Sequence, residues 1–159
     1  MRDPADGESW FAPSPKLLRM RRAELAAVAI VAAAIVFAAV FSRSVLAAVA
    51  SAVAVLVLAG VSEPLLRRRY RSWGYCERST DFLVRRGVMF RRLTVVPYGR
   101  MQLVDVTAGA VEQLFGLQTV RLHTAAAATD ARIPGLAPAE AMRLRDRLAS
   151  LGEAQAAGI

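Results

Sequence analysis

The stretch "RRGVMFRRLTVVPYGRMQLVDV", Arg85–Val106, decides the fold of this chain. Its arginines lie on either side of three apolar residues. Leu93–Val96 is rich in β-branched residues, and Met101–Val106 alternates between two faces, so both segments are expected to be strands. The stretch leaves three kinds of protein open: a nucleic-acid reader, a lipid-surface module, or a sheet with solvated edges.

The residues around this stretch extend the strand pattern and close it with a helix. Trp73–Arg78 and Leu117–Thr124 alternate as strands do, and Val111–Phe115 indicates a short helical turn. A helix is predicted from Pro138 to Gly152. Its buried stripe would consist of Ala141, Leu144, Leu148 and Leu151. Strands followed by one amphipathic helix predict a small α+β domain, an antiparallel sheet or partly closed barrel.

Two apolar runs precede this domain, Leu25–Phe41 and Val45–Val61, each of 17 residues. Each run contains nine Leu, Ile, Val or Phe residues, which together favour membrane insertion by about 4 kcal/mol. A buried hairpin in a soluble protein would need a polar face, and a cleaved signal peptide would not be followed at once by a second run. The runs therefore predict two transmembrane helices. Small residues spaced four apart would let them approach closely: Ala29 with Ala33, Ala34 with Ala38, and Ala48 with Ala52.

Basic residues flank the two runs unevenly. Lys16, Arg19, Arg21 and Arg22 precede the first run, and Arg67, Arg68, Arg69 and Arg71 follow the second. Only Arg43 lies between the runs. The positive-inside rule then predicts a multi-pass protein of the cell membrane with both termini in the cytoplasm.

The composition along the chain predicts three parts. Residues 1–22 are expected to form a flexible basic tail. Trp10 and Phe11 could reach a membrane interface, but a lone aromatic pair in a tail is more often uninvolved. Residues 23–63 would form the two-helix transmembrane hairpin, which Glu63 and Pro64 close. Residues 70–152 would form the cytoplasmic domain.

The formal net charge of +8 asks for an anionic partner, either nucleic acid or phospholipid head groups. Between Glu63 and Arg100, ten arginines are opposed only by Glu63, Glu77 and Asp81. A DNA reader would show a recognition helix, and an RNA reader would show exposed aromatic residues among the charges. Here the densest charge directly follows the second apolar run. We therefore expect membrane lipids as a partner and no nucleic acid.

The residues that usually carry chemistry are few and scattered. Cys76 is the only cysteine and His123 the only histidine, which excludes an internal disulfide and removes most metal and acid–base schemes. Asp105, Glu112 and Asp130 are too far apart along the expected strands and loops to form a carboxylate pair. No glycine-rich phosphate loop is present. We expect no enzyme, no cofactor and no metal site.

Several short motifs occur in a characteristic order. They are Gly87-Val88, Pro97, Arg100, Gln102, Val104-Asp105-Val106, Leu114-Phe115-Gly116-Leu117, Thr119-Val120-Arg121 and Ile133-Pro134-Gly135-Leu136. In this order they resemble the bacterial pleckstrin-homology-like (PH-like) family, in its YdbS-like membrane type. The resemblance implies a PH-like sheet capped by a C-terminal helix, with no known catalytic residues. Relatives often work beside larger membrane proteins and have been linked to envelope defence against antimicrobial peptides.

These observations predict a membrane-anchored, non-enzymatic PH-like module. It would act as an assembly subunit that docks onto copies of itself or onto a larger PH-like membrane protein, possible settings being cell-envelope stress or antimicrobial-peptide defence. The alternative is a sensor or binder of anionic lipid head groups.

Two sets of residues are candidates for these contacts. The candidates for contact with the lipid surface are Arg67, Arg68, Arg69, Arg71, Arg85, Arg86, Arg91 and Arg92, because each basic residue near an anionic surface gains about 1 kcal/mol. Gln102 and Asp105, expected on opposite strand faces, are candidates for a subunit contact. Alternatively, Gln102 satisfies a backbone group at a turn and Asp105 pairs with an arginine.

Overall fold

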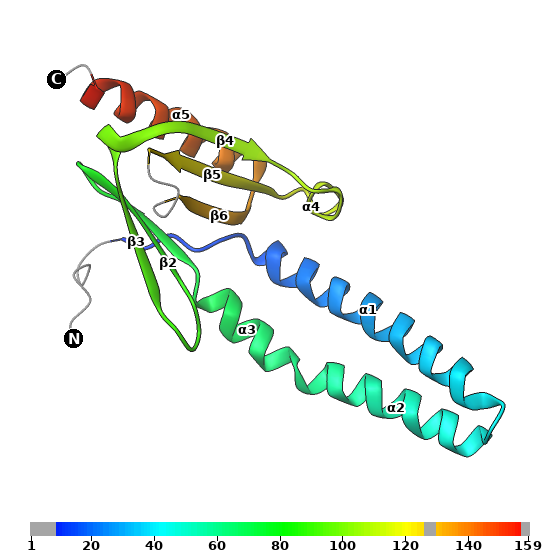
Figure 1. The fold of residues 1–159 in the computed structure, drawn as a ribbon. Helices are drawn as coiled ribbons and strands as arrows, with labels where there is room; N and C mark the ends of the chain where they lie inside the picture. Colours follow the sequence, from blue (N-terminus) through cyan, green and yellow to red (C-terminus); the bar gives the residue numbers. More distant parts are fainter. Residues whose placement is uncertain (1–8, 126–129, 157–159) are drawn as a thin grey trace. The chain divides into compact units, whose positions relative to one another are not determined.

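A computed structural model of the chain describes residues 9–125 and 130–156 (Figure 1). The chain divides into two compact units. One unit is Leu18–Arg68, and the other is Arg69–Ile159 together with Met1–Leu17.

The first unit is built from two long apolar helices and most of a short polar one. Helix α1 spans Pro15–Phe41, α2 spans Val45–Val61 and α3 spans Glu63–Arg71. Ser44 caps α2, because its Oγ accepts a hydrogen bond from the N–H of Ala47 at 3.4 Å. Since α3 continues α2 after Ser62, the stretches Pro15–Phe41 and Val45–Arg71 are each 27 residues long, and both are long and apolar enough to cross a membrane.

The two long helices run antiparallel (Figure 1), and Ala29, Ala33 and Ala48 are buried along them. Ala34 and Ala38 are exposed, so their predicted role in helix packing is wrong. At the open end of the hairpin, Glu63 accepts hydrogen bonds from Arg22 and Arg67.

Three strands form the first antiparallel sheet of the other unit, in the order β1-β2-β3. Strand β1 spans Gly74–Glu77, β2 spans Asp81–Arg86 and β3 spans Arg92–Pro97. The sequence pattern did not predict β2. Its residues Phe82–Val84 are buried in succession, so the strand lacks the alternation that marks a half-buried strand.

The second sheet is also antiparallel, in the order β4-β5-β6. The short helix η1 (Tyr98–Arg100) leads from β3 into β4 (Met101–Thr107), and α4 (Ala110–Leu114) leads into β5 (Gln118–Thr124). Strand β6 spans Ala131–Leu136. The two sheets stay separate and do not close into one barrel.

Helix α5 (Pro138–Ala156) completes the core. Three residues of its predicted stripe, Ala141, Leu144 and Leu148, are fully buried, which confirms that prediction. The helix runs past Gly152 to Ala156, because Glu153–Ala156 are good helix formers. Both sheets contribute to the core, with Tyr75, Phe82, Val84, Val96, Val120, Leu122 and Ile133.

The segment Trp10–Ser14, here called the strap, packs against the sheets. Phe11 and Tyr75 exchange two backbone hydrogen bonds of 2.9 Å, and their rings stack at 5.6 Å. The N–H of Ser14 donates to the carbonyl of Gly135 at 2.8 Å. The predicted tail over residues 1–22 is therefore wrong from the strap onward, because the strap satisfies strand edges and α1 begins at Pro15; residues 1–8 lie outside the described residues.

Candidate functional site

The arginine-rich stretch forms the hairpin between β2 and β3. The two strands are antiparallel, with Arg86 opposite Arg92 and Arg85 opposite Leu93. Residues 87–91 make the turn. At its start Gly87 has a φ of 109°, and a Cβ added there would lie 1.9 Å from the carbonyl oxygen of Phe90. Only glycine fits this turn without strain.

The four hairpin arginines differ in their surroundings. The guanidinium of Arg85 lies 4.6 Å from the centre of the Trp10 ring, a cation–π contact that holds the strap. Arg86 is half-buried, whereas Arg91 and Arg92 are exposed. Arg85 therefore has a structural role, and Arg91 and Arg92 are the ones accessible to an anionic surface.

The other predicted lipid contacts, Arg67, Arg68, Arg69 and Arg71, are all exposed on α3. At about 100° per residue they spread over roughly 200° of the helix surface and do not form one narrow stripe. Arg67 donates to Glu63 at 2.6 Å.

Ser72 connects the end of α3 to the hairpin turn. Its Oγ accepts a hydrogen bond from the N–H of Gly87 at 3.3 Å and donates to the carbonyl of Arg69 at 2.7 Å. The structure therefore brings the last arginines of α3 close to the turn that Arg86 and Arg91 flank. Sequence spacing gave no sign of this proximity.

The candidate subunit contacts lie on β4. The register of β4 against β5 shifts between Met101 and Leu103, which is a β-bulge. The bulge turns Gln102 and Leu103 outward together, so Gln102 and Asp105 are both exposed, and their predicted placement on opposite faces is wrong. Asp105 lies opposite Arg121 in the register, and Leu103, with 57% of its surface exposed, lies opposite His123.

The three carboxylates considered for catalysis each have different surroundings. Glu112 is buried; it accepts from the Thr119 hydroxyl at 2.8 Å and from the Gly109 N–H at 3.0 Å. Asp130 lies 3.4 Å from Nδ1 of His123 on the exposed side of β5. Asp105 stands apart on β4. Among the described residues, no group of three or more His, Cys, Asp or Glu could hold a metal ion.

A polar cluster that the sequence did not predict fastens α5 to β1. The Tyr75 hydroxyl donates to Glu140 at 2.8 Å, and Arg143 contacts both Glu140 and Glu77 at 2.7 Å. Arg143 lowers the pKa of Glu140, and burial raises the pKa of Tyr75. Because these partners satisfy one another, the cluster stabilises the domain.

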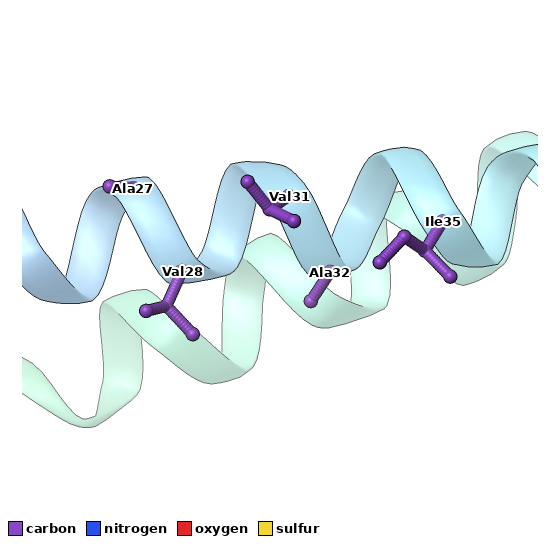
Figure 2. A pocket seen from close by; sticks show the side chains of 5 residues that line it. All are labelled: Ala27, Val28, Val31, Ala32 and Ile35. Atoms are coloured by element: carbon purple, nitrogen blue, oxygen red, sulfur yellow. The ribbon is translucent and has the colours of Figure 1, made fainter.

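A shallow hollow of about 370 Å³ lies on α1. Figure 2 shows its lining, which consists of Ala27, Val28, Val31, Ala32 and Ile35. All five side chains are apolar and come from one helix. No polar group is there to orient a ligand, as expected for a helix surface that faces acyl chains.

Two apolar helices, followed in the chain by two antiparallel sheets and a C-terminal helix, define a PH-like membrane module. The bacterial PH domain family matches residues 22–152, and the chain belongs to this family. The UPF0699 transmembrane protein YdbS of Bacillus subtilis (strain 168) is 34% identical over 83 residues, 52% of this chain and 51% of that relative. This chain thus spans about half the length of the relative. No solved structure matches this chain significantly. The family resemblance seen in the motifs is confirmed.

Proposed function

We propose that this chain is a membrane-anchored, non-catalytic interaction module that assembles with a second copy or with a larger PH-like membrane protein. The two apolar helices support the anchoring. The separate surroundings of Asp105, Glu112 and Asp130 support a non-catalytic role. The excess of basic residues at the outer ends of the helices, against Arg43 alone between them, supports cytoplasmic termini and a cytoplasmic domain.

The outer edge of β4 carries the assembly proposal. β4 pairs with β5 on one side and has no second strand neighbour in the described part of the chain. Its exposed residues are Gln102, Leu103 and Asp105. An edge strand that presents an apolar side chain among polar ones is suited to pair with another chain.

The mass of the full chain in nanodiscs tests this proposal. We expect a discrete oligomer for the unmodified chain, or a discrete complex with the larger partner when it is captured from native membranes. Leu103→Lys should reduce either assembly to the single chain. Leu114→Lys is the matched control, because Leu114 is 84% exposed on α4, and it should leave the assembly intact. An L103K variant that keeps its assembly would contradict the role of β4.

A second candidate function, the binding of anionic head groups, is favoured by the exposure of Arg91 and Arg92 beside the turn. If these residues respond only to the surface potential, Arg→Lys changes at both positions should leave binding of the domain to anionic vesicles nearly unchanged. This binding should also fall steeply as the salt concentration rises. If they form a pocket for one head group, the same changes should abolish binding to that lipid, because lysine lacks the bidentate geometry of arginine.

The proposed cellular setting, cell-envelope stress or antimicrobial-peptide defence, rests on the family resemblance. A deletion strain should become more sensitive to cationic antimicrobial peptides, and the unmodified gene should restore resistance. Unchanged sensitivity would remove this setting without affecting the assembly proposal.

A further inference from the structure

The β2–β3 turn carries three consecutive apolar side chains in an exposed position. Val88 is 45% exposed, Met89 83% and Phe90 84%. We call Val88–Phe90 the finger. The strand before it is well buried, since Phe82 and Leu83 are both fully enclosed. The exposure of the finger is therefore a local feature of the turn and not a sign of a loosely packed sheet.

The base of the finger is held in place by neighbouring groups. The positive φ of Gly87 sets the turn, and the Gly87 N–H donates to Ser72 Oγ at 3.3 Å. On the strand before the turn, Arg85 lies over the Trp10 ring at 4.6 Å. The hairpin thus presents Met89 and Phe90 on a supported turn, away from the core that could otherwise bury them.

The charged residues next to the finger in the sequence are all arginines. Arg86 precedes the finger, and Arg91 and Arg92 follow it. Between Asp81 and Asp105 the sequence has no acidic residue. Ser72, which contacts the turn, directly follows Arg71, the last residue of α3. An apolar tip with an aromatic ring, surrounded by arginines, matches the chemistry of a lipid interface, where aromatic rings lie at head-group depth and arginines meet phosphates.

We propose that the finger inserts into the head-group region of the anionic membrane leaflet, with Arg86, Arg91 and Arg92 on lipid phosphates. The charge favours this occupant over a second copy of the chain, because a second copy would have to bring acidic residues to the finger. The proposal rests on the membrane anchoring proposed above, but not on assembly through β4. It adds insertion of apolar side chains to the attraction of the arginines for the surface.

A fluorescent label on residue 89 tests the insertion in the full chain. Met89→Cys is labelled with an environment-sensitive dye, and Cys76 serves as an unreactive background because it is buried. The matched control is Ser79→Cys, exposed in the turn at the opposite end of β2. Both variants are placed in nanodiscs of anionic lipid with a spin-label quencher on the acyl chains just below the head groups.

We expect a blue-shifted, strongly quenched dye at residue 89 and an unquenched dye at residue 79. Quenching at 89 no greater than at 79 would overturn the proposal. So would energy transfer between labels on two copies without lipid quenching, because the finger would then bind a second copy. Equal quenching in neutral nanodiscs would overturn the part assigned to the arginines.

The role of the arginines has its own matched pair of variants. Arg91→Gln with Arg92→Gln should weaken quenching at residue 89 in anionic nanodiscs. Arg121→Gln with Arg132→Gln removes the same charge from facing positions on the other sheet, and quenching should be retained. Equal loss in both double variants would show that overall charge, and not the finger, controls the contact.

The same samples separate this inference from the assembly proposal. Leu103→Lys that loses its assembly but keeps quenching at residue 89 would contradict only the role of β4. An intact assembly without quenching at residue 89 would overturn only the finger.

Discussion

Gly87 has a φ of 109°, in the region that side-chain-bearing residues rarely adopt, and its missing Cβ leaves room for the Phe90 carbonyl. Gly87→Ala should therefore destabilise the domain by about 1–3 kcal/mol, the usual cost of a strained backbone residue. Thermal unfolding in detergent would measure the loss. Gly99→Ala is the control, because a Cβ there meets nothing closer than the Gln155 Oε1 at 3.6 Å. Equal stability of the two variants would contradict the strained turn.

Tyr98 gives the domain a sensitivity to alkaline pH. Burial, with a smaller contribution from nearby acidic groups, raises the pKa of Tyr98 to about 12. An unfolded tyrosine ionises near pH 10, so the folded domain holds a proton that the unfolded chain releases. The stabilisation is complete below about pH 10 and is lost as pH rises towards about 12.

The variant Tyr98→Phe tests this dependence. It removes the hydrogen bond from the Tyr98 hydroxyl to the Arg78 carbonyl, 2.8 Å, which should cost about 1 kcal/mol at neutral pH. The variant should then lose less stability than the unmodified chain as pH rises. Chemical unfolding across the alkaline range would measure both effects, and parallel pH curves would contradict the assignment to Tyr98.

Among the elements, the strap covers the outer edge of β1 and is expected to protect it. Phe11→Ala should remove the ring stacking on Tyr75, worth about 1 kcal/mol, and speed hydrogen exchange at the Tyr75 amide, which donates to the Phe11 carbonyl. Phe90→Ala is the control, because its ring is 84% exposed, and in detergent it should leave exchange at Tyr75 unchanged. Unchanged exchange in both variants would contradict the protective role of the strap.

The elements differ in how well the sequence predicts them, for physical reasons. The long helices could be predicted because each contains an uninterrupted apolar run. Helix α5 could be predicted because its apolar residues recur at helical spacing. Strand β2 could not, since it is buried on both faces and does not alternate. The strap could not either, because its contacts with Tyr75 and Gly135 are made by backbone groups, which leave no side-chain pattern.

The candidate site was predictable only in part. The arginines were identifiable from their clustering, but the different role of Arg85 depends on Trp10, which is distant in sequence. Leu103 became a candidate only once the bulge turned it outward with Gln102. The exposure of Met89 and Phe90 was not predicted either, because apolar residues beside strands are usually buried. The turn that begins at Gly87 places them outside the core.

For the whole molecule, cysteine labelling in intact cells tests the predicted orientation. Ser42→Cys, in the link between α1 and α2, should react with a membrane-impermeant reagent added outside. Ser79→Cys should react only after the cells are permeabilised. The buried Cys76 should not react with the reagent in either variant. Labelling of residue 79 from outside would reverse the orientation and would place the finger at the outer leaflet.

The strap also has a mechanical consequence. The chain leaves the sheets for the apolar helices at Leu17 and returns at Arg69. The Tyr70 hydroxyl, which donates to the Pro13 carbonyl at 2.8 Å, ties the outgoing and returning segments together. Within the sheet-bearing unit, the segment that leads into the helices and the segment that returns from them are therefore held next to each other, and the strap is fixed at both Tyr75 and Tyr70.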